Sequence, residues 1–237
     1  ITGNLIYANV TNPIFVENNT SIVELGVTYY VIDDNNCGIY FNDTINSKII
    51  KNNDVLLLNN LTKGQTLSID IPVNITYYKE NVSSIVNLIL NSGASSVNIT
   101  NLTLINSTLT LNNVSKVYIK NNNLTNSSIS VVGGRGNYVI NNSLSGENGG
   151  AFIRLVNTSS NHIFSNNITF NNLVDVIIIK NSKDNEFVYN NISGIANKVV
   201  NSVDSSYTEF NHNNLTISGV SIFGYYACNS AYDSIKY

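Results

Sequence analysis

Residues 163–169 read IFSNNIT, and this seven-residue unit recurs along most of the chain. The unit is an apolar residue, two variable residues, two asparagines, an apolar residue, and Thr or Ser. Close copies stand at residues 119–125 (IKNNNLT), 139–145 (VINNSLS), 187–193 (FVYNNIS) and 210–216 (FNHNNLT), and looser ones at 32–38, 56–62, 77–83 and 97–103. Nine copies that follow one another at intervals of 20 to 24 residues indicate a structural repeat.

A second pattern lies upstream of each later copy. Two apolar residues alternate with variable ones, as at Ile153 and Leu155 or at Ile177 and Ile179, and a turn residue such as Asn157 follows two positions later. Each period therefore holds two or three short strands separated by Asn or Gly turns, and no segment has a helical period. Such a unit cannot bury its own apolar face, whereas stacked units bury a continuous core. The sequence predicts an all-β solenoid, a single-stranded parallel β-helix of nine to ten coils, roughly 40 Å long at about 4.8 Å per coil.

Over residues 32–217 the repeat resembles the right-handed, pectate-lyase-like β-helix family, whose hallmark is an internal ladder of stacked Asn side chains. The resemblance implies a right-handed coil, and it implies little about function because this scaffold carries many activities. It also accounts for a composition in which 46 of 237 residues are Asn. Both Asn of each pair are candidates for this scaffold, and the second Asn of each unit is assigned to the ladder. The predicted ladder residues are Asn36, Asn60, Asn81, Asn101, Asn123, Asn167, Asn191 and Asn214.

The repeat runs through most of the chain without a linker, so a single domain over residues 1–237 is expected. Residues 1–31 lack the unit and are expected to form an N-terminal coil or cap, residues 32–219 the regular coils, and residues 220–237 a C-terminal cap or contact segment. Because the chain begins at Ile1 without a leader, we interpret it as a processed or excised segment.

Charge is scarce: 11% of residues are charged and the net charge is −3. Without a basic run, nucleic acid is not an expected partner, and no apolar run is long enough for a membrane span. No cofactor and no metal site are predicted. Cys37 occupies a slot that is apolar in the other units, so we expect it to be a core residue rather than a nucleophile.

Asn-x-Ser/Thr sequons are frequent, but many of them coincide with the repeat itself. If the second Asn of the unit faces inward, those sequons are inaccessible after folding. The better glycosylation candidates lie outside the ladder, at Asn9, Asn18, Asn42, Asn74 and Asn106.

The column just before the first apolar residue of each unit is expected to point outward. Glu186 and Glu209 would then stand one strand spacing apart beside His162, which could support acid/base chemistry. The same face carries aromatic and apolar residues suited to sugar stacking or protein docking. Its residues are Tyr118, Tyr138, Ile140, His162, Phe164 and Val188. A loop or the C-terminal tail packing over this face is the alternative.

These features favour a non-enzymatic, extracellular cell-surface protein, similar to the Asn- and Thr-rich adhesin-like proteins of methanogenic archaea. Adhesion, envelope structure and self-assembly into a lattice or filament are the expected roles, with other copies of the chain, neighbouring envelope proteins or glycans as partners. Two alternatives remain: a polysaccharide lyase or glycoside hydrolase that uses Glu186, Glu209 and His162, and a carbohydrate-binding module.

Overall fold

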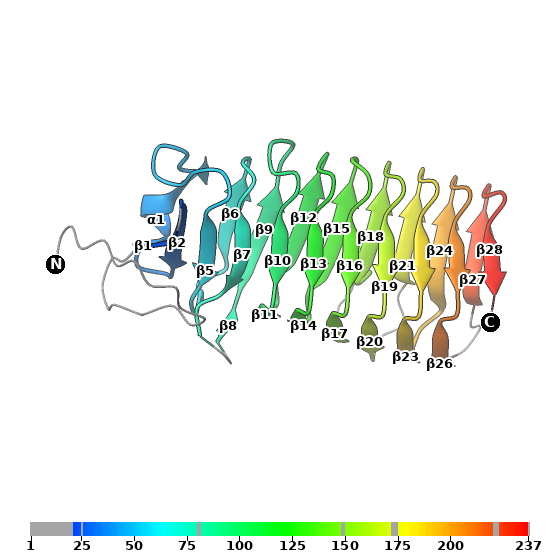
Figure 1. The fold of residues 1–237 in the computed structure, drawn as a ribbon. Coiled ribbons are helices and arrows are strands. Elements are labelled where there is room, and N and C mark those ends of the chain that lie inside the picture. Colours follow the sequence, from blue (N-terminus) through cyan, green and yellow to red (C-terminus); the bar gives the residue numbers. More distant parts are fainter. Residues whose placement is uncertain are drawn as a thin grey trace.

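The computed structural model describes residues 21–24, 26–79, 82–147, 150–171, 175–219 and 223–236. These residues form a β-solenoid in which successive coils stack along one axis, from the N-terminal end at the left of Figure 1 to the C-terminal end at the right. Strands from successive coils pair in parallel and build three long sheets, as the repeat predicts. The described ranges contain a single helix, which has four residues. No helix among these residues is long and apolar enough to cross a lipid bilayer.

The eleven-stranded sheet is the longest of the three. All of its strand pairs are parallel except the first, in which β1 runs antiparallel to β2. Its strands, in order, are β1 (Ser21–Glu24), β2 (Val27–Ile32), β5 (Val55–Leu58), β7 (Asn74–Tyr77), β10 (Asn98–Thr100), β13 (Tyr118–Lys120), β16 (Tyr138–Ile140), β19 (His162–Phe164), β22 (Glu186–Val188), β25 (Glu209–Asn211) and β28 (Ser234–Lys236).

Two further sheets complete each coil. The seven-stranded sheet contains β8 (Ser83–Ser84), β11 (Thr103–Ile105), β14 (Asn123–Thr125), β17 (Ser143–Gly146), β20 (Asn167–Phe170), β23 (Asn191–Ile195) and β26 (Asn214–Ser218). The eight-stranded sheet contains β6 (Gln65–Ile69), β9 (Val86–Leu90), β12 (Thr108–Asn112), β15 (Ser128–Val132), β18 (Ile153–Val156), β21 (Asp175–Lys180), β24 (Lys198–Val203) and β27 (Phe223–Cys228).

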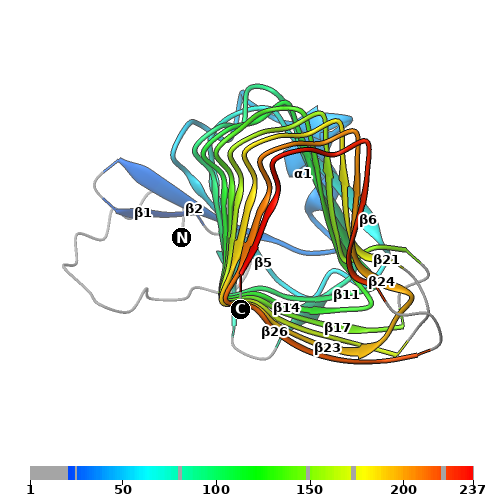
Figure 2. The ribbon, with the colours of Figure 1, turned by 90° about the vertical axis from the view of Figure 1, so that its right-hand side faces the viewer.

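The coil is right-handed, as the family resemblance implied. Figure 2 views the solenoid from its C-terminal end: the chain runs down the eleven-stranded sheet, along the seven-stranded sheet and up the eight-stranded sheet. This path is counterclockwise while the chain advances toward the viewer, which defines a right-handed turn.

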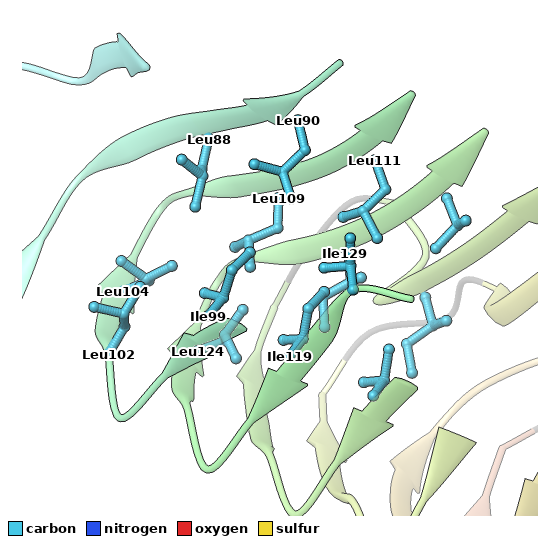
Figure 3. Close-up of a cluster of buried hydrophobic side chains, with 14 of the residues drawn as sticks. Leu88, Leu90, Ile99, Leu102, Leu104, Leu109, Leu111, Ile119, Leu124 and Ile129 are labelled. Carbon is cyan, nitrogen blue, oxygen red and sulfur yellow. The ribbon is translucent and has the colours of Figure 1, made fainter. Parts of the chain in front are cut away.

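The core consists of like residues stacked in register. On the eight-stranded sheet, Leu88, Leu109, Ile129 and Ile153 are paired in successive strands and are all buried. Figure 3 shows Leu88, Leu109 and Ile129 of this column together with residues of the other two sheets, such as Ile119 and Leu124, which point into the same interior. Burial of each Leu or Ile side chain away from water stabilises the fold by about 1.5–3 kcal/mol. Stacked coils therefore have a stability that a single coil lacks.

A buried Asn ladder lies at the turn between the eleven- and seven-stranded sheets. The Oδ1 atom of Asn166 accepts hydrogen bonds from the backbone N and the Nδ2 of Asn142, both at 3.0 Å. The Nδ2 of Asn166 donates in turn to Asn190 Oδ1 at 2.9 Å and to the Val139 carbonyl at 2.8 Å. The ladder comprises Asn122, Asn142, Asn166, Asn190 and Asn213.

The assignment of the second Asn of each unit to the ladder was wrong by one residue. Side chains alternate from the turn into the strand, so the residue after an inward ladder Asn must point outward. Four of the assigned residues, Asn123, Asn167, Asn191 and Asn214, begin strands of the seven-stranded sheet and are exposed. Asn60 and Asn101 are exposed turn residues with positive φ. Asn81 lies outside the described residues.

The first assigned ladder residue, Asn36, has a local role instead. Its Nδ2 donates to the Val31 carbonyl and its Oδ1 accepts from the Asp33 amide, just before the helix α1 (Cys37–Tyr40). The short antiparallel strands β3 (Phe41–Asn42) and β4 (Thr44–Ile45) follow. Residues 32–38 therefore form an irregular first coil rather than a regular copy of the unit.

A second buried ladder was missed because Asn occupies its position in only three consecutive coils. It lies just before the strands of the eleven-stranded sheet. Asn161 Oδ1 accepts hydrogen bonds from the backbone N and the Nδ2 of Asn137. Asn185 Oδ1 accepts hydrogen bonds from the backbone N and the Nδ2 of Asn161 in the same way, and the four distances are 2.8–3.1 Å. In the next coils Thr208 and Asp233 take the same position.

The two ends of the described chain differ. At the N-terminal end, β1 covers the edge of the eleven-stranded sheet in antiparallel orientation. At the other end, β27 and β28 pair in parallel with β24 and β25, so residues 223–236 form a further coil. The strands of this segment keep the register of the repeat, and its predicted role as a C-terminal cap or contact segment stays a prediction.

Candidate functional site

The candidate site is the outer face of the eleven-stranded sheet. Residues at the first position of successive strands lie side by side in register: Asn98, Tyr118, Tyr138, His162, Glu186 and Glu209. The structure thus brings together the residues of the outward column that the repeat predicted. No loop of the described chain forms a strand over this sheet.

The aromatic members of this column stack on one another along the solenoid axis. The ring centroids of Tyr118 and Tyr138 lie 4.7 Å apart at an interplanar angle of 5°, and those of Tyr138 and His162 lie 4.7 Å apart at 16°. The faces of Tyr138 are therefore covered by its neighbours. The column presents ring edges and hydroxyl groups outward, which suits docking better than the stacking of a sugar on Tyr138.

A second column, at the third position of the same strands, is mainly apolar in its middle. Ile140, Phe164 and Val188 are neighbours in register, with Lys120 on one side and Asn211 on the other. Ile140 and Phe164 are half-buried and Val188 is buried. The Phe164 ring centroid lies 5.6 Å from that of His162, so the two columns contact each other at the centre of the face.

Glu186 and Glu209 stand on adjacent strands, as expected for a carboxylate pair. The Nδ1 atom of His162 lies 2.9 Å from Glu186 Oε2, and both side chains are about one-third exposed (29% and 33%). Glu209 Oε2 accepts a long hydrogen bond of 3.4 Å from Asn211 Nδ2. This arrangement offers two carboxylates and an imidazole on an open surface. Over the described residues no group of three or more His, Cys, Asp or Glu side chains is arranged to hold a metal ion.

Two exposed aromatic pairs flank the face and were not found from the sequence. Tyr207 and Tyr232 stack at one margin, with centroids 5.0 Å apart, and Tyr189 and His212 stack at the other, 5.4 Å apart. The exposed fraction of the side chain is 52% for Tyr207, 76% for Tyr232 and 66% for Tyr189. All four residues have positive φ, a conformation that Tyr rarely adopts. Each of these residues directly precedes a ladder position in the sequence, and this placement is the signal that could have identified the two pairs.

The arginines and the acidic doublet are not part of a catalytic cluster. Arg154 points outward on β18 between two buried residues, and Arg135 is exposed in a turn. Asp33 accepts hydrogen bonds from the Asn35 and Asn36 amides and so shapes a turn. Asp34 bonds to Thr62 of the next coil, and the hydroxyl donor lowers the pKa of its carboxyl.

Cys37 and Cys228 are both free. Cys37 is buried, and burial raises the pKa of its thiol, which disfavours the reactive thiolate. It is therefore a core residue, as predicted. Cys228 is exposed on β27, at the opposite end of the solenoid from α1 (Figure 1).

The outward position of the second Asn in each unit changes the accessibility of the sequons. Asn101, Asn123, Asn167, Asn191 and Asn214 were expected to be inaccessible, yet all are exposed. Among the candidates outside the repeat, Asn42 and Asn106 are exposed and Asn74 is half-buried, with its Oδ1 bonded to Asn98. Asn9 and Asn18 lie outside the described residues.

Comparison of the chain with protein-family models and with curated proteins found no match.

Proposed function

We propose that the protein is a non-enzymatic, extracellular cell-surface β-solenoid that acts by packing its eleven-stranded sheet against other copies or neighbouring envelope proteins. The observation that carries this proposal is the continuous outer column from Tyr118 through Tyr138 and His162 to Glu186, beside the apolar column of Ile140, Phe164 and Val188. Ordered, contiguous side chains of this kind are typical of docking surfaces.

Low charge supports a structural or adhesive role. Only 11% of residues are charged, and many of the exposed residues are Asn, Ser or Thr. Similarity in composition and repeat to the Asn- and Thr-rich adhesin-like proteins of methanogenic archaea supports a place on the cell surface and a role in adhesion or envelope structure. Exposed sequons on the seven-stranded sheet are consistent with a glycoprotein, and Asn123, between the small residues Thr103 and Ser143, is the least crowded of them.

Sedimentation tests the proposal directly. The chain is expected to associate reversibly as its concentration rises, and Phe164→Asp should weaken this association at least tenfold because it places a charge in the apolar column. Thr110→Asp, on the outer side of the eight-stranded sheet, is the matched control and should leave association unchanged. A chain that stays monomeric at every concentration contradicts packing against other copies.

A glycoside hydrolase or polysaccharide lyase is the second candidate function. It is favoured by one observation, the juxtaposition of Glu186 and Glu209 on adjacent strands with His162 beside them. Two carboxylates about 5 Å apart suit a retaining glycosidase. Release of reducing sugar or unsaturated product from a polysaccharide panel, abolished by Glu186→Gln and Glu209→Gln, would favour this candidate. Retained binding without turnover would instead favour a carbohydrate-binding module.

A further inference from the structure

We propose that the eleven-stranded sheet packs against the same sheet of a second copy, with the two solenoids antiparallel and a two-fold axis near His162 and Phe164. The inference rests on the proposed function, because it names the partner and the orientation for the same face. It follows from how charge and shape are distributed along the solenoid axis.

The exposed charges on the outer face and in the turn that precedes its strands are basic on the coils before β19 and mainly acidic on the coils after it. Lys116, Lys120 and Arg135 are exposed on the coils that precede β19. On the coils that follow it, Asp184 and Glu209 are exposed and Glu186 is half-buried. The coils after β19 also carry two cations, Lys183 and Lys236. Lys236 lies on β28, the last strand of the sheet. The central coil carries His162 and Phe164 between these halves.

A two-fold axis parallel to the strands determines which residues meet. Such an axis reverses the order of the coils and keeps each outward column opposite the same column of the partner. With the axis at β19, β16 lies opposite β22 of the second copy, and β13 lies opposite β25. Each basic coil is then placed opposite an acidic one, and each pairing occurs twice.

The central contacts in this arrangement are complementary in polarity. Phe164 meets its own symmetry mate, and Ile140 meets Val188, so apolar side chains face apolar side chains. In the other column, the hydroxyl of Tyr138 is opposite the carboxylate of Glu186. A phenol O–H that donates to a carboxylate makes a charge-assisted hydrogen bond.

The peripheral contacts mainly place a charged group opposite an aromatic one. Tyr118 is placed opposite Glu209, and Lys116 opposite the ring of Tyr207, a cation–π arrangement. Gly136 is the residue opposite Asp184 of the second copy, and Arg135 is the neighbour of Gly136 in the sequence. Lys183 falls opposite Arg135 in this arrangement, an unfavourable pair that the carboxylate of Asp184 offsets.

The alternative with parallel solenoids lacks this complementarity. A two-fold axis along the solenoid would place the basic coils opposite basic coils and the acidic coils opposite acidic coils, and like charges at close range repel. The face spans seven coils, or roughly 30 Å at about 4.8 Å per coil, and is about five residues wide. A contact of this size is at the lower limit of specific interfaces, so a micromolar rather than nanomolar dissociation constant is expected.

Charge reversal with complementation is the principal test. An acidic variant, Lys116→Glu with Lys120→Glu, and a basic variant, Asp184→Lys with Glu209→Lys, should each dimerise at least tenfold more weakly than the natural chain. An equimolar mixture of the two variants should recover the dimer, because the acidic coils of one then face the basic coils of the other. Arg154→Glu with Lys180→Glu reverses two charges on the eight-stranded sheet and should have no effect.

Cysteine cross-linking tests the orientation. In a Cys228→Ser background, which removes the exposed thiol, Phe164→Cys should form a disulfide-linked dimer on mild oxidation because residue 164 faces itself. A mixture of Tyr118→Cys and Glu209→Cys chains should form the mixed dimer. Thr110→Cys is the control and should remain monomeric.

The outcomes separate the inference from the proposed function. If the natural chain never associates, packing between copies fails together with the inference, and of the proposed function only packing against other envelope proteins is left. If the chain associates but the charge variants behave like the Arg154 and Lys180 control, or the mixed cysteine dimer does not form, only the antiparallel arrangement is overturned.

Discussion

Asparagine has two distinct roles in this protein, and the two roles require opposite orientations of the side chain. Inward Asn residues form the ladder, in which each amide bonds to the next coil. Other Asn residues occupy turns with positive φ, such as Asn113, Asn157 and Asn181, because Asn tolerates the left-handed region better than most residues. The high Asn content therefore reflects turn geometry as much as the ladder.

The ladder should be far more sensitive to substitution than the outward Asn beside it. Asn166→Ala leaves the Asn142 backbone N–H and Nδ2 without their buried acceptor, which should lower the free energy of unfolding by about 3 kcal/mol or more. Asn167→Ala, one residue later and exposed, should change it by less than about 0.5 kcal/mol. Urea denaturation of the two variants measures the difference, and equal destabilisation would contradict the assigned orientations.

One tyrosine should titrate well apart from the others. Burial, together with a hydrogen bond from its hydroxyl to Asp233 at 2.9 Å, raises the pKa of Tyr225 to about 12. Because the folded pKa lies above the usual value near 10, Tyr225 stabilises the fold fully below pH 10, and this contribution is lost as the pH rises toward 12.

Absorbance titration of phenolate should show one late-ionising group that Tyr225→Phe removes. The variant should also lose part of the fall in stability between pH 10 and 12. If Tyr225→Phe leaves the alkaline titration unchanged, Tyr225 is not the late-ionising group.

At the scale of elements, each strand is too short to be stable alone, and the turns determine its register. Successive strands of the eleven-stranded sheet have only three residues each from β10 to β25. The turn before them holds a residue of positive φ in each coil, including Lys116, Gly136, Ser160 and Asp184. These turns place the ladder Asn inward and the Tyr, His and Glu column outward.

The Gly-Gly-Arg-Gly turn offers a test of this element-level control. Gly134 has φ of +72°, and a Cβ there would lie 1.9 Å from the Val114 carbonyl oxygen. Gly134→Ala should therefore destabilise the fold by at least about 2 kcal/mol. Gly136 also has positive φ but open space around it, so Gly136→Asn should cost less than about 1 kcal/mol. Thermal unfolding followed by circular dichroism distinguishes the two, and a tolerated Gly134→Ala would refute the close backbone approach.

At the scale of the whole molecule, stability depends on stacking, since each coil contacts mainly its neighbours. Strands in the middle of the sheets, such as β16, are paired on both sides, whereas β28 is paired on one side among the described residues. Side-by-side packing of two such solenoids would add contacts along their length without altering the stack.

Hydrogen exchange should reveal this gradient. Amides of β13, β16 and β19 are expected to exchange slowest, and those of β28 fastest among the strands of the eleven-stranded sheet from β5 onward. At concentrations that favour the proposed dimer, protection should not spread to the eight-stranded sheet. Uniform protection along the solenoid would show that the coils unfold as one cooperative unit instead.

The sequence by itself determined the solenoid, because a period of 20 to 24 residues with alternating apolar positions has one economical packing solution. It also identified the outward column of Tyr118, Tyr138, His162, Glu186 and Glu209, since alternation along a strand specifies which residues share a face. Only the tertiary structure decided which Asn of each pair is buried, because a turn residue of positive φ sets the phase of that alternation. It likewise decided that the aromatic rings cover one another's faces and that charge is divided along the axis. These properties arise from stacking between coils, which no single unit of the sequence contains.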